Sequence, residues 1–338
     1  WGDVSGSDPA GEVGGFEWGG DSVLPYEVSE DYDRDLRPSR LDCIVIENDC
    51  LRAVVAPSLG GRLIELKDLA TGRDLVFRNP VFQPANLAAL NAWFSGGIEW
   101  NGLIPGHTAF TCAPVFAGVR DTPQGPILRI YEFDRIVEAT WQIDLFMPAD
   151  KPQLYAHGRI VNPSAEAKLA YWWTNIAAPM GPGTRVLSPA DYSIEHIWPG
   201  NNLGRCEFPR KDWDASYPDH WENATSVFFR APSAQRLFIA SVDREGHGLA
   251  QTSTREMGGR KFFYFGSAAG GQNWMDYLSR PGEGGYLEIQ SGIAPTQNQR
   301  FELAGGEELD WTEAFVPVHL DPLKAHDPAY GAAVSHAD

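Results

Sequence analysis

The sequence of 338 residues has no long apolar run and little basic charge. No segment approaches the roughly 18 consecutive apolar residues that a membrane-spanning helix needs, and no secretory signal is recognisable. Lysine and arginine number 27 against 45 aspartates and glutamates, which are spread along the chain and leave a net charge of −18. We therefore expect neither a membrane nor nucleic acid as a partner, whereas neutral ligands remain open.

The sequence also lacks the motifs of several common chemistries. It contains no G-x-S-x-G nucleophile elbow, P-loop, dinucleotide-binding fingerprint, H-E-x-x-H motif or EF-hand loop. Its four cysteines form no C-x-x-C pair and show no metal-ligand spacing. Serine-esterase, nucleotide-binding, zinc-protease and calcium-switch functions thus lack their minimum parts, and we expect no metal and no cofactor.

Helical periodicity is scarce, and short β-rich runs separated by turns take its place. The 35 glycines and 25 prolines supply turn residues. Strands are predicted at residues 43–47, 51–56, 60–66, 127–133, 136–146, 153–161, 168–175, 226–229, 237–242, 261–265 and 286–291. Short helices are predicted at residues 84–94 and 321–334. Because neither βαβ alternation nor a repeat of 20 to 50 residues is present, we predict an all-β antiparallel sandwich or barrel-like fold.

The composition divides the chain into three regions. Residues 1–40 are rich in Gly, Asp, Ser and Glu and are predicted to form an irregular lead-in. Residues 41–320 carry the β-rich runs and are predicted to form one large domain. Residues 321–338 read as a linker that enters a helix.

The segment at residues 284–292 contains the first candidate functional residues. In a strand, Glu288 and Gln290 point to the same face, inside an otherwise apolar run. Aromatic residues precede it, among them Trp274. Aromatic rings beside a few hydrogen-bonding groups are what a sugar ring needs, so this face is predicted to bind a saccharide. The alternative is a solvated strand face, the usual place of a glutamate.

The glycine-rich stretch at residues 93–108 is the second candidate. Glu99, Asn101 and His107 place an acid, an amide and an imidazole within nine residues, next to Trp100. As a functional site it would combine proton transfer with a stacking surface. As a purely structural element it would be a turn whose tryptophans close the edge of the sandwich.

Two further groups of residues are weaker candidates. Trp173 and Asn175 share one face of a predicted strand, so the amide could bind a sugar hydroxyl beside the indole. His220 stands in a cluster of polar and aromatic residues. Each of these residues would equally fit a half-buried structural role.

The residues around Glu288 resemble a known group of enzymes. The string Leu-Glu-Ile-Gln at residues 287–290 is similar to the Leu-Glu-Thr/Pro-Gln strand of galactose mutarotases, the aldose 1-epimerases. In those enzymes the glutamate is the base that takes the proton of the anomeric hydroxyl. The resemblance implies the same role for Glu288 and the galactose mutarotase-like β-supersandwich as the fold.

A second resemblance covers residues 41–317. Gly-Gly-Ile-Glu-Trp-Asn at 96–101, Trp-Thr-Asn at 173–175, Gly-Arg-Lys at 259–261, Thr-Gln at 296–297 and Trp-Thr-Glu at 311–313 resemble an uncharacterised bacterial family. That family has this fold and often precedes tetratricopeptide repeats. The resemblance implies a soluble bacterial protein, cytoplasmic or periplasmic, with further domains C-terminal to this chain.

The sequence departs from the mutarotases at one catalytic position. Their histidine lies in a His-x-Tyr-Phe-Asn strand, and Tyr171 stands at the matching place here. The proton donor must then come from elsewhere, and His107 or Glu99 are the candidates.

Three functions follow, all with a mono- or oligosaccharide as the ligand. The first is glycoside hydrolysis by Glu288 and Glu99, which would be retaining at a carboxyl separation of about 5–5.5 Å and inverting at about 6.5–9.5 Å. The second is an aldose 1-epimerase with Glu288 as base and His107 as acid. The third is a non-catalytic sugar-binding module with Trp100, Trp173 and Trp274 as platforms.

Overall fold

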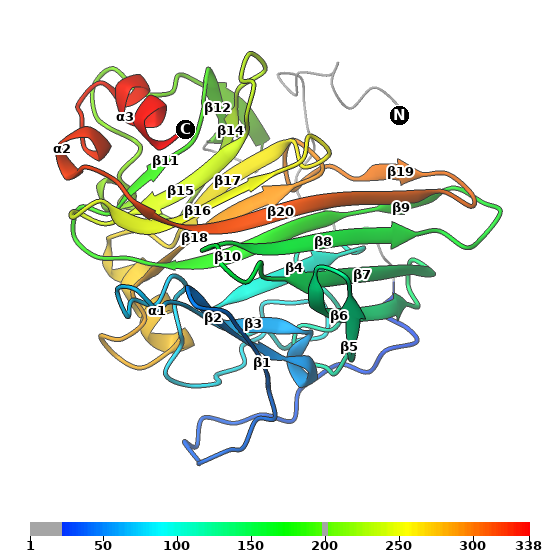
Figure 1. Ribbon diagram of the computed structural model, residues 1–338. Coiled ribbons are helices and arrows are strands. Elements are labelled where there is room, and N and C mark those ends of the chain that lie inside the picture. Colours follow the sequence, from blue (N-terminus) through cyan, green and yellow to red (C-terminus); the bar gives the residue numbers. More distant parts are fainter. Residues whose placement is uncertain (1–21, 198–201) are drawn as a thin grey trace.

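The computed structural model describes residues 22–197 and 202–338 and contains two large antiparallel sheets packed face to face (Figure 1). The first sheet has the strand order β1 (Ile44–Glu47), β2 (Leu51–Ala56), β3 (Arg62–Asp68), β4 (Ile98–Gly102), β10 (Trp172–Pro179), β18 (Tyr286–Gly292), β17 (Gly259–Tyr264), β14 (Thr225–Arg230), β12 (Tyr192–Ile197) and β13 (Asn202–Cys206). The central strands of this sheet therefore come from distant parts of the chain.

The second sheet covers one face of the first. Its order is β11 (Arg185–Leu187), β15 (Phe238–Val242), β16 (His247–Ser253), β20 (Glu308–His319), β8 (Leu154–Val161), β7 (Ala139–Phe146), β6 (Gly125–Asp134) and β5 (Phe116–Thr122). A small pair joins β19 (Phe301–Leu303) to β9 (Lys168–Ala170), and the short helical elements are η1 (Pro57–Leu59), η2 (Pro218–His220), α1 (Ala269–Leu278), α2 (Pro322–Ala325) and α3 (Tyr330–Ala337). The predicted all-β antiparallel sandwich with few helices is confirmed.

The core lies between the two sheets and is centred on indole rings. In β7 and β8 buried and half-buried residues alternate strictly, as expected of strands with one face on the core. Trp172 on β10 packs against Trp141 on β7 and Trp311 on β20, with ring centroids 6.1 and 4.7 Å apart. Gly158 on β8 leaves room for this cluster, because a Cβ atom there would lie 2.2 Å from the Trp311 ring.

A buried carboxylate connects the sheets within this core. Glu313 on β20 is fully buried and accepts hydrogen bonds from Thr174 on β10 (2.6 Å), Ser291 on β18 (2.8 Å) and Gln251 on β16 (2.9 Å). Burial raises the pKa of Glu313, while these hydrogen bonds favour its charged form. The Trp-Thr-Glu motif thus serves the interior of the sandwich.

The predicted helix at residues 84–94 is wrong, and α1 was not foreseen. Ala85 and Trp93 pair in an isolated β-bridge, and Asn91 between them has φ of 64°. Both bridge residues pack with Leu278 at the end of α1. Near the start of α1, Gly271 has a steric reason to be glycine, because a Cβ atom there would lie 2.1 Å from the carbonyl oxygen of Gly266. The sequence did not predict this helix because glycine has a low helix propensity.

The ends of the chain differ in structure. Residues 22–43 contain no helix or strand, and residues 1–21 of the predicted lead-in lie outside the described part. At the other end, the predicted helical segment forms α2 and α3, separated by four residues. The buried Arg185 on β11 donates to the carbonyl oxygens of Ala325 (3.0 Å) and Asp327 (2.8 Å), which docks this segment on the sandwich. The domain boundaries remain predictions.

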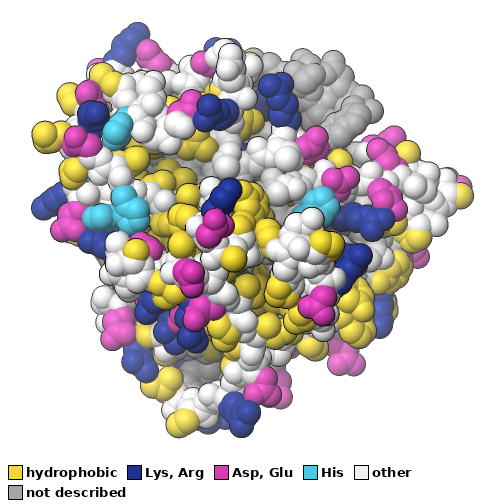
Figure 2. All heavy atoms as spheres, in the orientation of Figure 1, with side chains coloured by type: hydrophobic (Ala, Val, Ile, Leu, Met, Phe, Trp, Pro, Cys, Tyr) yellow, Lys and Arg dark blue, Asp and Glu magenta, His cyan; other side chains and the backbone are white. Residues whose placement is uncertain are grey.

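The surface mixes charges of both signs. Figure 2 shows acidic and basic side chains interspersed around a central group of hydrophobic side chains on the face of Figure 1. Across residues 22–197 and 202–338, none of the helices has the length and apolarity needed to cross a membrane.

Candidate active site

A row of polar side chains crosses the outer face of the first sheet. Glu99 on β4 lies opposite Asn175 on β10, which lies opposite Gln290 on β18, and Gln290 lies opposite Lys261 on β17. Their sequence neighbours, such as Trp100 and Ile289, point into the core between the sheets. Because side chains alternate along a strand, register alone places these four residues on one face.

Glu288 lies on the same face, two residues before Gln290 along β18. It is opposite Ala177 on β10 and Phe263 on β17, and it is 6% exposed. Gln290 Nε2 donates to Glu288 Oε2 at 2.7 Å. Burial raises the pKa of Glu288, and the positive charge of Lys261 opposes this shift. A buried carboxylate with a raised pKa is suited to accept and return a proton.

A chain of hydrogen bonds connects Lys261 to Glu288. Lys261 Nζ donates to Gln297 Oε1, and Gln297 Nε2 donates to Gln290 Oε1 at 2.7 Å. Gln290 in turn donates to Glu288. Burial lowers the pKa of Lys261 to about 8, although the nearby Glu288 favours its charged form. Lys261 and Gln297 were absent from the predicted site. Lys261 ends the Gly-Arg-Lys motif at 259–261, and Gln297 ends the Thr-Gln motif at 296–297.

Glu99 is held in place by four donors. Its Oε1 accepts from Thr111 Oγ1 (2.6 Å) and lies 3.1 Å from Arg62 Nη2, and its Oε2 accepts from Trp93 Nε1 (3.0 Å). His107 Nδ1 lies 3.0 Å from the same Oε2. Burial alone would raise the pKa of Glu99, but the charges of Arg62 and His107 outweigh it and hold this pKa well below its usual range. Glu99 is therefore ionised at neutral pH.

His107 gains a defined orientation from this contact. The ionised Glu99 is an acceptor, so the His107 Nδ1 atom carries the proton between them. The imidazole also packs against Trp93, with ring centroids 4.8 Å apart, and its side chain is 23% exposed. Nε2 has no hydrogen-bond partner within the described residues. The positive charge of a protonated His107 would lower the pKa of Glu288, against the effect of burial.

The two predicted asparagines differ in their surroundings. Asn175 lies in the row, and its Oδ1 is a buried acceptor with no partner among the residues described. Asn101 Oδ1 instead accepts from the backbone N–H of Thr108 at 3.2 Å and fixes the loop that carries His107.

The predictions for Trp100 and Trp173 need correction. Trp100 is 1% exposed, points into the core and donates from Nε1 to the carbonyl oxygen of Gly61. Trp173 shares the outer face but is fully buried against Gly259 and Gly292, where a Cβ atom would lie within 3 Å of its ring. Neither indole offers a free face to a sugar.

Trp274 and His220 lie apart from Glu288. Trp274 on α1 is 43% exposed and lines a cavity of about 570 Å³ that it shares with Asn86, Leu87, Asn273 and Tyr277. His220 at the end of η2 is exposed, and its Nδ1 lies 2.8 Å from the carbonyl oxygen of Asp214. It borders a separate cavity of about 250 Å³. The part of the chain described here holds no cluster of three His, Cys, Asp or Glu side chains arranged to hold a metal.

The fold is that of galactose mutarotase-like β-sandwich proteins. A putative mutarotase from Salmonella typhimurium aligns with a TM-score of 0.59 and 13% identity, covering 82% of this chain and 91% of that one. A putative aldose 1-epimerase from Klebsiella pneumoniae aligns with a TM-score of 0.56 and 13% identity, covering 84% and 79%. At these identities the likeness concerns the fold.

The family is more specific than the fold class. A TPR-domain containing protein from Parabacteroides distasonis aligns with a TM-score of 0.75 and 22% identity over 87% of this chain, which spans 50% of that protein. Residues 20–321 match the family described as domain of unknown function DUF5107. The chain belongs to this family. The predicted membership of an uncharacterised family with the mutarotase-like fold is confirmed.

Proposed function

We propose that this domain catalyses acid–base chemistry at the anomeric carbon of a sugar, as an aldose 1-epimerase. The proposal depends on one observation above all, the buried carboxylate of Glu288 on the same sheet face as the Glu99–His107 pair. Glu288 acts as the base and His107 as the acid. Asn175, whose buried Oδ1 has no hydrogen-bond partner among the described residues, is a candidate for binding a sugar hydroxyl.

The reaction balances without any other reagent. Glu288 takes the proton of the C1 hydroxyl while His107 Nε2 gives a proton to the ring oxygen, and the bond between C1 and that oxygen breaks to leave an open-chain aldehyde. Rotation about the bond between C1 and C2 presents the other carbonyl face. The ring hydroxyl then adds back as His107 recovers its proton and Glu288 returns its own, so only the anomer changes.

The surrounding residues support these two roles. Ionised Glu99 orients the His107 ring through its contact with Nδ1, as carboxylates do for catalytic histidines in general. Gln290 fixes one oxygen of Glu288 and leaves the other available. Lys261, linked through Gln297, keeps positive charge near the carboxylate and opposes the effect of burial on its pKa.

Glycoside hydrolysis by Glu288 and Glu99 fits this geometry poorly. Hydrolysis needs one carboxyl protonated and one ionised. Glu99 accepts from Thr111 and Trp93 and pairs with Arg62 and His107, all of which favour its ionised form. It therefore cannot serve as the proton donor, and because both of its oxygens are already held by these four groups, neither is free to act as the nucleophile or base with Glu288 as the donor. We do not carry this pair forward.

A sugar-binding role without catalysis is the second candidate. It draws on the cavity at α1, where the exposed Trp274 and Tyr277 lie beside the side-chain amides of Asn86 and Asn273. Aromatic faces next to amides suit an oligosaccharide. In either case the proposed partners are a mono- or oligosaccharide and domains C-terminal to this chain, of the kind that the Parabacteroides distasonis protein contains.

Polarimetry on freshly dissolved aldoses tests the proposal. We expect the protein to accelerate anomer exchange without releasing product, and Glu288→Gln and His107→Gln each to reduce the rate by about 10²–10⁴-fold, the usual contribution of a general acid or base. Glu283→Gln is the matched control, because Glu283 is exposed in the loop before β18.

Three outcomes are informative. Unchanged anomer exchange in folded Glu288→Gln would refute the base role. Saturable sugar binding without any exchange, retained in Glu288→Gln but lost in Trp274→Ala, would favour the binding module instead. Unfolding midpoints of all variants establish that lost activity does not reflect lost structure.

A further inference from the structure

A third cavity lies at one end of the first sheet, and Glu288 is not among its lining residues. It has a volume of about 790 Å³ and is bordered by the end of β14, the β16–β17 connection and the segment after β18. Its apolar wall includes Leu237, Ile293 and Pro295. Residues of the polar row are absent from its lining, so this cavity is a separate site.

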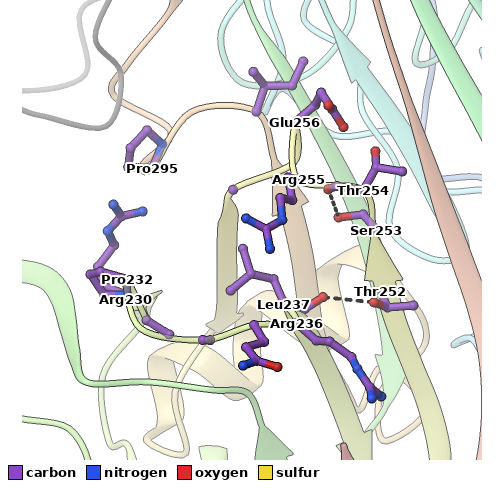
Figure 3. A pocket seen from close by; sticks show the side chains of 15 residues that line it. Arg230, Pro232, Arg236, Leu237, Thr252, Ser253, Thr254, Arg255, Glu256 and Pro295 are labelled. Carbon is purple, nitrogen blue, oxygen red and sulfur yellow. Dashed lines mark hydrogen bonds between the residues drawn. The ribbon is translucent and has the colours of Figure 1, made fainter.

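Two arginines on its walls have no acidic partner. Arg230 and Arg255 line the cavity, and neither forms an ion pair within the described residues. The Nε atom of Arg230 is buried and lacks a hydrogen-bond partner there. In Figure 3 the guanidinium groups of Arg230 and Arg255 extend into the space between the two chain segments that carry them. Unpaired guanidinium groups facing a cavity favour an anion.

A third arginine adds positive charge beneath the cavity. Arg260 is buried and donates to the carbonyl oxygen of Leu237 (3.1 Å) and to Ser253 Oγ (2.6 Å), both of which belong to lining residues. Burial lowers the pKa of Arg260 to about 10, so this side chain is still charged at neutral pH.

The remaining charged residues at the cavity do not neutralise it. Arg236 pairs with Asp338, whose Oδ1 lies 3.6 Å from its Nη1, and in Figure 3 it extends away from Arg230. Glu256 also lines the cavity, and its carboxylate lies on the far side of the chain from Arg230 in the same view. The charge of Glu313 in the interior offsets that of Arg260, whereas the two arginines on the walls, Arg230 and Arg255, face one acidic residue.

We propose that this cavity binds a small organic anion, whose phosphate or carboxylate group is held by Arg230 and Arg255. The planar guanidinium groups suit the oxygens of either group, and the apolar wall receives the rest of the ligand. The inference is independent of the chemistry proposed at Glu288. The cavity would thus be a local site for an anion on a chain whose own net charge is −18.

Calorimetric titration of the full chain at low ionic strength tests the inference. The probes are glucose 6-phosphate and glucuronate, with inorganic phosphate as the minimal anion and glucose as the neutral control. We expect saturable binding of at least one organic anion, weakened by added salt. Arg255→Gln is expected to reduce the affinity at least tenfold, because the charged hydrogen bonds from this guanidinium to the anion are lost.

Matched controls separate the site from overall charge. Arg120→Gln removes the same charge from an exposed position on β5 and should change the affinity less than twofold. Arg255 is exposed, so Arg255→Gln should fold, and Arg230→Gln is the second test. Absence of saturable binding of both organic anions, or unchanged affinity in Arg255→Gln, would overturn the inference. Retained anion binding in Glu288→Gln would leave it intact even if the epimerase proposal failed.

Discussion

At the scale of single residues, the two glutamates of the site differ because their neighbours differ. Glu288 has one amide donor and a lysine reached through two glutamines, and its pKa is raised. Glu99 has an arginine, a histidine, a hydroxyl and an indole, and its pKa is lowered. The same side chain thus has a raised pKa at one position, as the proposed proton transfer requires, and is fixed as a charge at the other.

Replacing Glu99 should destabilise the protein in a pH-dependent way. Glu99→Gln leaves the buried Arg62 without its counter-charge, so we expect a loss of about 3–5 kcal/mol in the free energy of unfolding at pH 7. Because the folded pKa is lowered, the stabilisation by Glu99 is present above its unfolded pKa of about 4.3 and is lost as the pH falls below it. Urea unfolding at pH 7 and at pH 3 measures the difference.

The control for this measurement is an exposed ion pair. Glu308 pairs with Arg159 at the surface, where both side chains are more than a third exposed. Glu308→Gln should cost less than about 1 kcal/mol at either pH. A loss equally small in Glu99→Gln would contradict the role assigned to the Glu99–Arg62 pair.

At the scale of elements, much of the sheet structure could be predicted because strands bury every second residue. The same alternation placed Glu288 and Gln290 on one face correctly. The prediction of a helix at 84–94 is wrong because Ala85 and Trp93 instead pair in a β-bridge. Both residues pack against Leu278 on α1, a contact that the local sequence does not reveal. Trp100 and Trp173 were misjudged because sequence shows that an indole is present but not which sheet face is covered.

The close packing of Trp311 on β20 against Gly158 on β8 gives a test at this scale. Gly158→Ala introduces a Cβ atom 2.2 Å from the indole, so we expect a loss of about 1–3 kcal/mol from overpacking. Gly118→Ala on β5 is the matched control, because nothing lies within 4 Å of its added methyl group. Chemical unfolding of both variants measures the effect. Equal stabilities would show that the core yields at this point.

At the scale of the whole molecule, the site could be only partly predicted because its members meet through long-range pairing. Glu99 and Lys261 are separated by 162 positions in numbering, and the register of four strands brings them into one row. Gln297 enters from a connection after β18. Its part in the site depends on the hydrogen bond to Gln290, and no local pattern reveals such a partner.

This dependence on pairing predicts how function is lost. We expect anomer exchange and tryptophan fluorescence to decline at the same urea concentration, because the site requires β4, β10, β18 and β17 together. Six tryptophans among the described residues are at most 3% exposed and will report unfolding by a shift of their emission. Loss of activity well below the fluorescence transition would mean that the site opens locally instead.

The hydrogen bonds that Arg185 makes to the segment before α3 have a consequence for assembly. They hold the last helix against one side of the sandwich, with Tyr330 donating to the carbonyl oxygen of Ser188 at 2.7 Å. A helix that is anchored by a buried cation and a phenol has a fixed orientation on the sandwich. Any repeats joined to it would inherit a fixed direction relative to the row of Glu99, Asn175, Gln290 and Lys261.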